Sequence, residues 1–535
     1  MSETANESVQ ALVNHARGHA LGDLLRRSAA RFPDKLAVVA GSHRQTYREF
    51  NASVNAVAAE VSSRGVAFGD RIALLSRNCW EYAVLNFALA KIGAVMVPIN
   101  FMLSAPEVAY ILQHSGASGM IVEDGLREIA GPALASAGIT QGIRGWIGAG
   151  PAVCPPGWSE VASWAVRTDA DEPDVVVGDD DLMHLMYTSG TESRPKGAML
   201  SSRSLIAQYV SAIVDGGMEA DDVEVHALPM YHCAQMHCFF VPDVYLGATN
   251  VILPDAGAAR LLATIEAEGV TKLFAPPTVW ISLLRSPEFD TTNLSTLRKG
   301  YYGASAMPVE VLREIQRRLP DVRLWNFYGQ TELAPVATIL KPEDQLARPG
   351  SAGKPVLNVE TVLLDDDDRP VAADEVGEIA HRSPQVVLGY WNDRDKTADA
   401  FRNGWFHSGD LGVMTEDGYL SVVDRKKDMI KTGGENVASR EVEEAIYLLD
   451  GVAEVAVFGI DHPHWVEAVA AVVVPRPGAD ITAETVQEHA RAVLAGFKRP
   501  KYVVIGGQLP KNPSGKILKR ELRQIYADLA REDGQ

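Results

Sequence analysis

"YTSGTESRPKG" spans Tyr187–Gly197 and directly follows the apolar run "LMHLM" at Leu182–Met186. The run predicts a buried strand, and the next segment, with its serines, threonines, two glycines and a lysine, predicts a loop. Backbone N–H groups, hydroxyls and the Lys196 ammonium can together hold phosphate oxygens. The hydroxyl donors would be Thr188, Ser189 and Thr191, around Gly190. The loop therefore favours a nucleotide site, and a polar surface turn is the alternative.

The spacing of this loop excludes the two commonest nucleotide-binding patterns. A P-loop needs G-x-x-x-x-G-K-[ST], but counting from Gly190 the second glycine position is Pro195, and Lys196 is followed by Gly197. In the sequence, no Gly-x-Gly-x-x-Gly opens a helix after a strand, so a Rossmann cofactor site is unsupported. The loop must belong to another class of nucleotide-handling protein.

Composition narrows the class of protein. The chain has 535 residues, which predicts more than one domain, and its formal net charge of −19 argues against general nucleic-acid binding. Four scattered cysteines without metal-ligand spacing indicate reduced thiols. We find no signal peptide and no run approaching the ~18 apolar residues of a membrane span, and we expect a soluble cytoplasmic protein without an integral membrane segment.

Strand and helix patterns alternate through the first part of the chain. Short apolar runs such as "KLAVVAG" (Lys35–Gly41) and "AVMVPIN" (Ala94–Asn100) predict strands, and "WEYAVLNFALAKIG" (Trp80–Gly93) predicts a helix that ends near its glycine. This alternation is typical of parallel sheets covered by helices. After about Val356 the strands are joined by acidic turns, and the C-terminal part reads as a compact α+β unit. We therefore predict an α/β fold with a second, smaller domain.

Five further segments follow the loop in a fixed order. They are "YYGASAMP" (Tyr301–Pro308), "NFYGQTE" (Asn326–Glu332), "WFHSGDLG" (Trp405–Gly412), "VDRKKDMIKTGGENV" (Val423–Val437) and "LPKNPSGKILKREL" (Leu509–Leu522). Together with the loop, they resemble the adenylate-forming superfamily, in particular its acyl-CoA synthetase branch. The resemblance implies a large N-terminal domain of layered parallel and mixed sheets with a small barrel-like subdomain (1–426), and a small mobile α+β domain (427–535).

The resemblance also implies a two-step reaction with ATP, Mg²⁺ and coenzyme A. A carboxylic acid attacks the α-phosphate of ATP to give acyl-AMP and pyrophosphate, and a thiol then displaces AMP. Lys516, Thr188, Glu332 and His232 would be the catalytic set, with Glu332 as the metal ligand. A glutamate that caps a helix and a lysine in a solvated turn are the ordinary alternatives for Glu332 and Lys516. The implied nucleotide site consists of Thr188, Ser189, Gly190, Thr191, Lys196, Gly303, Ala304, Ser305, Asn326, Tyr328, Gly329, Gln330, Thr331, Glu332, Asp410, Arg425 and Lys516.

The second half-reaction would use another part of the smaller domain. By resemblance, Lys427 lies at the hinge between the domains. The coenzyme A loop would comprise Lys431, Gly433, Gly434 and Glu435. Glycines at this place would let the pantetheine arm pass close to the backbone. We expect free coenzyme A as the thiol, with no nucleic-acid partner, and we leave a homodimer open.

The opening loop departs from the family pattern at two positions. The pattern is usually Tyr-Thr-Ser-Gly-Thr-Thr/Ser-Gly-x-Pro-Lys-Gly, whereas Glu192 and Ser193 replace the hydroxyl residue and the middle glycine here. A carboxylate near phosphates repels them unless Mg²⁺ or Arg194 screens it. We expect a working ATP site with Glu192 turned outward, and a catalytically dead protein is the alternative.

The acid pocket is expected along Ala227–Phe240, Ala275–Trp280 and Gly329–Thr338. Peptide-synthetase domains carry an aspartate in the first segment for the substrate ammonium, and the counterpart here is His232, which argues against amino acids. The expected lining is Met230, His232, Met236, Val279, Trp280, Gly303 and Gly329, with Phe239 and Phe240 beside them. Methionines adapt to varied aliphatic chains. We therefore favour a fatty or other apolar acid. The alternatives are an aryl-CoA ligase of the 4-coumarate type, a ligase that loads a carrier protein, luciferase-like oxidation, and a non-catalytic binding homologue.

Overall fold

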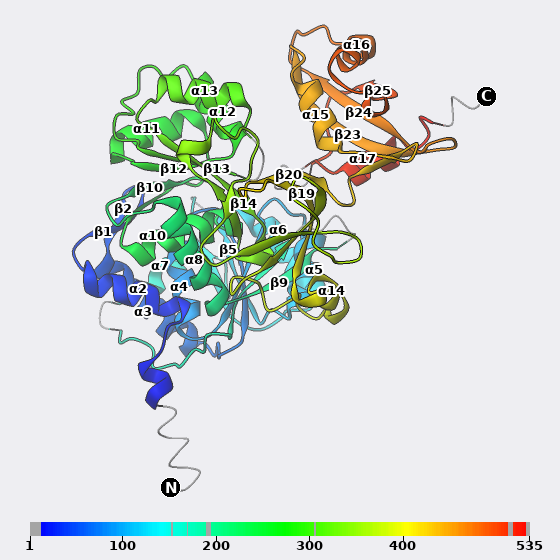
Figure 1. Cartoon of the computed structure of the whole chain (residues 1–535). Coiled ribbons are helices and arrows are strands. Elements are labelled where there is room, and N and C mark those ends of the chain that lie inside the picture. Colours follow the sequence, from blue (N-terminus) through cyan, green and yellow to red (C-terminus); the bar gives the residue numbers. More distant parts are fainter. Residues whose placement is uncertain are drawn as a thin grey trace. The chain divides into compact units, whose positions relative to one another are not determined.

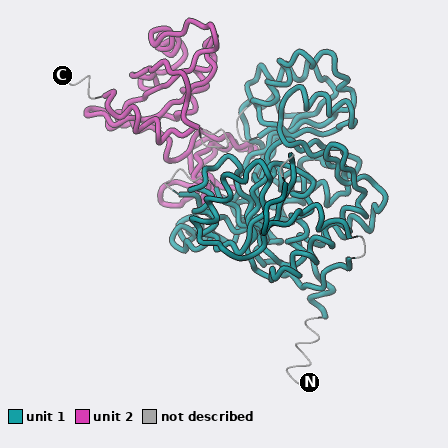
Figure 2. Tube along the Cα trace, turned by 180° about the vertical axis from the view of Figure 1, so that it is seen from behind, with its two compact units in different colours: residues 1–188, 194–360, 381–406 teal, residues 189–193, 361–380, 407–535 magenta. Residues whose placement is uncertain are grey.

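The computed structural model describes residues 12–150, 153–167, 170–188, 194–303, 307–511 and 517–530. The chain forms two compact units (Figure 2). Unit 1 comprises Met1–Thr188, Arg194–Glu360 and His381–Phe406, and unit 2 comprises Ser189–Ser193, Thr361–Ala380 and His407–Gln535. This grouping does not test the predicted boundary at residue 427, which stays a prediction.

The first sheet of unit 1 has seven strands in the order β7-β6-β5-β3-β4-β8-β9. Two of its strands, β5 and β9, are labelled in Figure 1. All neighbouring pairs are parallel except β8 and β9, which form the antiparallel pair around the predicted phosphate loop. The strands are β3 (Arg71–Leu75), β4 (Val95–Ile99), β5 (Gly119–Glu123), β6 (Arg144–Ile147), β7 (Ser159–Glu160), β8 (Leu182–Thr188) and β9 (Lys196–Ser201).

The second sheet of unit 1 has nine strands in the order β16-β15-β14-β13-β12-β10-β11-β1-β2. The run from β14 to β1 is parallel, and the strands at both ends are antiparallel to their neighbours. The strands are β1 (Leu36–Ala40), β2 (His43–Thr46), β10 (Val223–His226), β11 (Thr249–Ile252), β12 (Lys272–Phe274), β13 (Lys299–Gly303), β14 (Arg323–Gly329), β15 (Val336–Leu340) and β16 (Lys354–Pro355).

Helices cover both faces of both sheets, because these parallel strands are apolar on both sides. A large core, which includes Leu25, Val57, Leu85 and Phe240, lies between the two sheets, and separate cores lie on their outer faces. The middle layer is α2 (Leu21–Arg31), α3 (Tyr47–Ser63), α4 (Trp80–Lys91), α8 (Ser202–Gly216) and α10 (Val241–Leu246). The outer helices are α5 (Ala105–Ser115) and α6 (Arg127–Ala137) on the seven-stranded sheet, and α11 (Ala258–Glu268), α12 (Pro277–Arg285) and α13 (Val309–Arg318) on the nine-stranded sheet.

Local sequence explains why individual helices begin and end where they do. Helix α3 begins after Thr46, whose hydroxyl accepts from the Glu49 N–H while the Glu49 carboxylate accepts from the Thr46 N–H. Helix α4 is buried along nearly its whole length, and the chain turns at Gly93 with φ of +69°. The predicted helix over Trp80–Gly93 and its glycine stop are therefore confirmed.

Unit 2 contains two smaller sheets. The four-stranded sheet has the order β17-β18-β19-β20, and the other has the order β22-β21-β24-β23, with β25 pairing with β24. Their strands are β17 (Glu360–Leu364), β18 (Val376–Arg382), β19 (Phe406–Met414), β20 (Leu420–Arg425), β21 (Ile430–Thr432), β22 (Glu435–Val437), β23 (Val452–His462), β24 (Val466–Pro475) and β25 (Tyr502–Ile505). The accompanying helices are α14 (Arg394–Ala400, which itself belongs to unit 1), α15 (Ser439–Tyr447), α16 (Ala483–Val493) and α17 (Lys519–Ile525). The predicted α/β fold with a smaller α+β part is confirmed.

Candidate active site

The topology of the nine-stranded sheet brings the predicted site segments to one edge. Strands β10, β12, β13 and β14 run in the same direction, so the segments that follow them leave the sheet at the same edge. The chain passes from β10 to β11 on one side and then returns to β12 on the other, so the strand order reverses between β10 and β12. In open α/β sheets, ligands bind at the carboxyl edge beside such a reversal. The predicted acid segments and Gly329–Glu332 lie at this edge.

Asn78 holds the segment that follows β10 through side-chain hydrogen bonds. Its side-chain oxygen accepts from the Met230 N–H at 2.8 Å, and its amide donates to the carbonyls of His226, Leu228 and Leu253 at 2.8–3.3 Å. The Asn78 side chain is buried, so these bonds do not compete with water. One asparagine therefore fixes the entry to the predicted acid segment. Sequence reasoning missed it, because a single asparagine after a strand carries no recognisable pattern.

Glu332 lies in a short 3₁₀ helix (η3, Thr331–Leu333) and is only 8% exposed. The Tyr390 hydroxyl donates to its Oε1 at 2.9 Å. The Lys196 ammonium lies 5.2 Å from the centre of the same tyrosine ring. Tyr390 was not among the residues selected from the sequence, but it contacts two of them.

The carboxylate of Glu332 fits the metal-ligand role that the resemblance implies. Among the described residues, no hydrogen bond or ion pair reaches its second oxygen, Oε2. Mg²⁺ prefers carboxylate oxygens and is held through one or two of them together with substrate phosphates. Glu332 could hold the ion beside a lysine, and the bound ion would reduce the negative charge of the phosphates.

A side-chain contact joins the acid segment to the nucleotide segment. Cys233 Sγ lies 3.0 Å from Thr331 Oγ1, and Cys233 is 2% exposed. Burial raises the pKa of the Cys233 thiol to about 12, so it is neutral at pH 7 and is not an activated nucleophile. The predicted neighbours Thr331 and the His232 segment therefore do lie together.

His232 precedes the one-turn helix α9 (Cys233–Gln235) and caps it. Its Nδ1 accepts from the Ala234 N–H at 3.2 Å. The side chain is exposed, yet the surrounding protein desolvates the ring and lowers the pKa of His232 below its ordinary value. A neutral ring agrees with the expectation that this position carries no counter-charge for an ammonium group.

Two glycines assigned to the nucleotide site are required by the backbone itself. A Cβ on Gly303 would lie 2.5 Å from the Phe327 carbonyl oxygen, and one on Gly329 would lie 2.0 Å from the Pro335 oxygen. Nearby, the Asn326 amide donates to the Ser351 carbonyl at 3.0 Å. Within the described chain, Gln330 Nε2 is buried and has no hydrogen-bond partner. The nucleotide roles of these residues and of Tyr328 stay predictions.

The apolar side chains expected to line the acid pocket are packed core residues. Met230, Met236, Phe239, Phe240 and Trp280 are each at most 2% exposed. Three of them belong to the core between the sheets, whereas Phe239 and Trp280 belong to two other clusters. Val279 is half-buried, so the accessible surface at these segments comes from residues such as His232 and Thr278. Their pocket roles also stay predictions.

Several predicted residues lie outside the part of the chain that the structure describes. They are Ser189, Gly190, Thr191, Glu192, Ser193, Ala304, Ser305 and Lys516. Both sides of the phosphate loop are nevertheless anchored: Thr188 and Lys196 are paired across β8 and β9, and the Arg194 guanidinium lies 5.5 Å from the ring of Tyr110. The predicted outward orientation of Glu192 stays untested.

In unit 2, two residues assigned to the nucleotide site, Asp410 and Arg425, contact each other. Arg425 Nε lies 2.9 Å from Asp410 Oδ1, across the antiparallel pair β19–β20. Gly433 and Gly434 form the turn between β21 and β22 with φ of +60° and +89°, a conformation that other residues rarely adopt. A Cβ on Gly434 would meet no atom within 4 Å, so the space beside this turn is open.

Comparisons with known proteins show to which family the chain belongs. The family of AMP-binding enzymes matches residues 25–391, and its C-terminal domain matches residues 441–516. The chain belongs to the AMP-binding enzyme family. It is therefore a member of the adenylate-forming superfamily, as the ordered segments indicated, and an AMP-forming acid–thiol ligase.

The relatives of this ligase act on different acids. A feruloyl-CoA synthase from an Amycolatopsis species is 36% identical over 511 residues, covering 95% of this chain and 100% of the relative. The long-chain-fatty-acid–CoA ligase FadD13 of Mycobacterium tuberculosis is 34% identical over 509 residues, covering 95% and 98%. The crystal structure of ATP-bound MatB from Rhodopseudomonas palustris aligns with a TM-score of 0.85 at 30% identity, covering 95% of this chain and 99% of that one. Family membership implies ATP and coenzyme A as co-substrates, and the names leave the acid open.

The ligase also contains a buried charge cluster, formed by Glu224, His226, Asp243 and Lys272, which are all inaccessible to solvent. The first three are of metal-ligand types and lie close enough to share an ion. Lys272 already supplies a cation: its Nζ lies 2.8 Å from Glu224 Oε2 and donates to Asp243 Oδ1. Lys272 thus provides a protein cation for both carboxylates, although Glu224 Oε1 and Asp243 Oδ2 have no hydrogen-bond partner among the described residues, and we assign the cluster no ligand.

No helix in the described part of the ligase is both long and apolar enough to cross a membrane.

Proposed function

We propose that this ligase activates an apolar, fatty-type carboxylic acid with ATP and transfers the acyl group to coenzyme A, giving acyl-CoA, AMP and pyrophosphate. The observation that supports this most is the contact between the two half-sites of unit 1. Cys233 of the acid segment touches Thr331, and the next residue, Glu332, is linked through Tyr390 to Lys196 of the phosphate hairpin. An acid held beside His232 would therefore lie next to the groups that handle the triphosphate.

The first half-reaction joins two anions, and the residues must offset their repulsion. A carboxylate oxygen of the acid forms a bond to the α-phosphorus, while the bond from that phosphorus to pyrophosphate breaks. Lys196 and Lys516 would place positive charge on the phosphates and on the new acyl–phosphate oxygen. Glu332 would hold Mg²⁺, which supplies further positive charge when it is bound.

The second half-reaction replaces the phosphate ester by a thioester. The coenzyme A sulfur forms a bond to the acyl carbonyl carbon, the carbon–oxygen bond to AMP breaks, and the thiol proton passes to water. We assign the thiol approach to the Gly433–Gly434 turn, because open space lies beside it. A hinge at Lys427 would let Lys516 serve the first step and the turn serve the second.

Aryl acids are the second candidate substrates. The 36% identity with a feruloyl-CoA synthase favours them. Tyr231 directly precedes His232 in the chain, and its ring meets the ring of Phe101 edge-to-face with ring centres 5.3 Å apart. The two rings could border an aromatic acid. The apolar composition of the acid segments is the reason for keeping fatty acids first.

We also infer a cytoplasmic location. All four cysteines, Cys79, Cys154, Cys233 and Cys238, are free thiols, which agrees with a reducing compartment that also holds ATP and coenzyme A.

The decisive experiment supplies ATP, Mg²⁺ and coenzyme A with a panel of saturated fatty acids, ferulate, 4-coumarate and amino acids. We expect stoichiometric AMP, pyrophosphate and acyl-CoA with a fatty acid and no turnover of amino acids. ADP as the product, or no nucleotide cleavage with any acid, would refute the proposed function. AMP formation with ferulate alone would replace the fatty acid by an aryl acid.

Two variants separate the half-reactions. We expect Lys516→Ala to abolish acid-dependent ATP–pyrophosphate exchange while supplied acyl-AMP is still converted to acyl-CoA. Gly434→Leu should do the reverse, because its side chain would fill the open space beside the turn. Equal losses in both half-reactions for both variants would exclude a division of labour within unit 2.

A further inference from the structure

We propose that Tyr390 is a positioning residue that holds Glu332 and Lys196 at a fixed separation, so that the carboxylate keeps one oxygen for a metal ion and the lysine ammonium stays at the start of β9, beside the phosphate loop. This inference rests on the proposed function, since it assigns a role within the same adenylation site. Tyr390 itself is not expected to touch the reacting atoms.

The hydroxyl of Tyr390 orients the Glu332 carboxylate. It donates to Oε1 at 2.9 Å, and both residues are less than a tenth exposed. A neutral donor satisfies one carboxylate oxygen without cancelling its charge. Because water has little access to this place, the hydrogen bond restricts the carboxylate to a rotamer that leaves Oε2 for a cation.

The ring of Tyr390 supports the lysine. The Lys196 ammonium lies 5.2 Å from the ring centre, within the range of a cation–π contact. Glu332 accepts from the Tyr390 hydroxyl, and Lys196 contacts the ring of the same tyrosine. The tyrosine therefore contacts both residues without adding a charge that would compete with a metal ion or a phosphate.

The backbone fixes Tyr390 to both partners. The Val387 N–H donates to the Glu332 carbonyl at 3.0 Å, and the Trp391 N–H donates to the Gly197 carbonyl at 2.8 Å. Between these ends, Tyr390 forms an isolated bridge with Ala198 of β9, and its N–H donates to Thr397 Oγ1 at 2.9 Å. The segment 387–391 therefore connects the Glu332 turn to the strand that begins with Lys196.

Two substitutions separate the hydroxyl from the ring. In the full-length protein, Tyr390→Phe should raise the Mg²⁺ concentration for half-maximal ATP–pyrophosphate exchange ~10-fold, since a hydrogen bond to a charged group is lost. The kcat should recover at saturating Mg²⁺. Tyr390→Leu should, in addition, raise the KM for ATP ~3-fold, because the ring contact with Lys196 is lost as well.

A binding measurement makes the test independent of turnover. Isothermal titration with a non-hydrolysable ATP analogue, at several Mg²⁺ concentrations, should show the same shift in Mg²⁺ dependence for Tyr390→Phe. The matched control is Tyr47→Phe, which removes another buried hydroxyl, one that donates to the Ala248 carbonyl at 2.6 Å. The control should lower the unfolding temperature and leave the Mg²⁺ dependence unchanged.

The outcomes distinguish this inference from the proposed function. If the wild-type protein forms AMP but Tyr390→Phe shows wild-type Mg²⁺ dependence in both assays, the positioning role is wrong and the ligase assignment stands. An equal shift in Tyr47→Phe would also overturn it, since the effect would then be a general loss of stability. If the wild-type protein binds no Mg²⁺ and ATP analogue, both proposals fall.

Discussion

Two groups of side chains in unit 1 combine a glutamate with a lysine, and they do so in opposite ways. In the buried charge cluster, Lys272 lies within ion-pair distance of two carboxylates, Glu224 and Asp243, and none of the three is exposed. In the candidate site, the neutral Tyr390 contacts both Glu332 and Lys196.

The pKa shifts in the buried charge cluster show how strongly its charged groups interact with one another. Burial disfavours the Lys272 ammonium, but the charges of Asp243 and Glu224 more than offset this and raise the pKa of Lys272 well above its ordinary value. Burial also raises the pKa of Glu224, although Lys272 opposes that shift. The cluster is thus held together by the attraction between Lys272 and the two carboxylates.

The difference indicates what makes a charged group available for function. A carboxylate that is paired with a buried lysine ammonium has a structural role, because an added metal ion would have to displace that ammonium group. A carboxylate that is fixed by a neutral donor keeps its charge and one free oxygen. The following predictions test this contrast between the structural and the functional glutamate.

The largest effect is expected in the buried charge cluster. Lys272→Met leaves two carboxylates in the interior without their cation and should reduce stability by about 3–5 kcal/mol. Urea unfolding of the full-length protein would measure the loss. The control is Arg44→Met, which breaks the partly exposed pair with Glu268 and should cost at most about 1 kcal/mol. Similar losses for both variants would contradict the distinction between buried and exposed pairs.

Glu332→Gln should leave stability nearly unchanged and reduce acid-dependent ATP–pyrophosphate exchange ~10²–10³-fold, by analogy with other removed charge-stabilising groups. The amide keeps the shape and can still accept from Tyr390, but it loses the charge for a metal ion. We expect the opposite result for Glu224→Gln. This substitution should shift the urea midpoint of unfolding and leave ATP–pyrophosphate exchange by the folded protein close to wild type. Equal effects of the two substitutions on stability and on ATP–pyrophosphate exchange would contradict the contrast between the two glutamates.

The pH dependence of stability should reveal the closed cluster. Burial, with a further contribution from Lys272, lowers the pKa of His226 to about 3, whereas an unfolded histidine titrates near 6.5. Below pH 6.5 the unfolded chain therefore binds a proton that the folded chain does not, and this histidine removes about 1.4 kcal/mol of stability per pH unit until its folded pKa is reached. Above pH 6.5 it has no effect.

His226→Gln should accordingly make the fall in stability between pH 6.5 and 4 less steep. Urea midpoints of the wild type and the variant at pH 7 and pH 5 would measure the slope. Parallel slopes would show that His226 already takes up a proton in the folded state.

The smallest effect is expected at the junction of the two half-sites. Cys233→Ala removes the sulfur that lies 3.0 Å from Thr331 Oγ1 and should raise the KM of the exchange reaction a few-fold, which corresponds to about 1 kcal/mol. Cys233→Ser keeps a hydroxyl at this place and should stay closer to the wild type. The KM values of both variants should be measured in one titration series. A higher KM for the serine variant than for the alanine variant would contradict the contact.

Sequence reasoning selected segments that the fold brings together in two places, whereas the roles of the selected residues stay predictions. Asp410 and Arg425 were both assigned to the nucleotide site, and Thr331 and His232 belong to segments expected along the acid pocket. In the structure Arg425 contacts Asp410, and Thr331 contacts Cys233, the residue after His232. The apolar residues Met230, Phe240 and Trp280 were expected to line a pocket, and they are packed core residues. Composition cannot distinguish the two situations, since a pocket wall and a core use the same apolar side chains.

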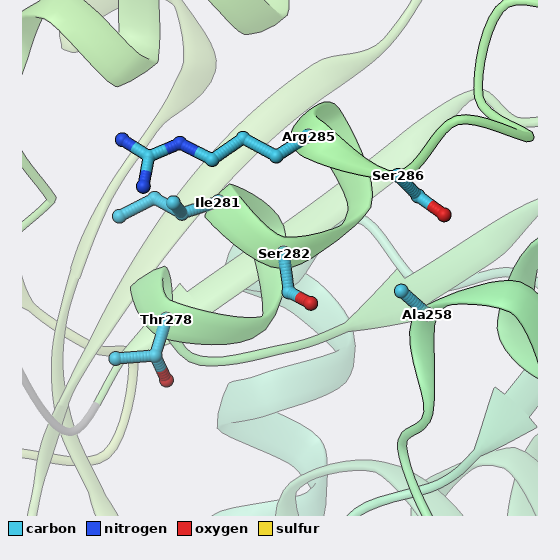
Figure 3. A pocket seen from close by; sticks show the side chains of 6 residues that line it. All are labelled: Ala258, Thr278, Ile281, Ser282, Arg285 and Ser286. Carbon is cyan, nitrogen blue, oxygen red and sulfur yellow. The ribbon is translucent and has the colours of Figure 1, made fainter. Parts of the chain in front are cut away.

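The structure also shows a surface hollow, of whose lining only Thr278 belongs to a segment expected along the acid pocket. The hollow measures about 460 Å³ and lies along one face of α12, which Thr278, Ile281, Ser282 and Arg285 share at i, i+3, i+4 and i+7 spacing (Figure 3). Ala258 and Ser286 complete its lining. Four of its side chains belong to α12, whose Trp280 packs into the core.

The sequence by itself determined the family, the order of strands and helices, and the identity of the charged residues at the site. These properties are local: hydrophobic periodicity spans one element, and each family segment spans about ten residues. Only the tertiary structure decided that Tyr390 lies between Glu332 and Lys196, and that Lys272 closes a charge cluster with Glu224 and Asp243. Tyr390 and Glu332 are 58 positions apart, and Lys272 and Asp243 are 29 apart, so their contacts depend on strand order and on the packing of helices over the sheet. A glutamate is the same residue in both places, and only the side chains that the fold places around it make one structural and the other available to a ligand.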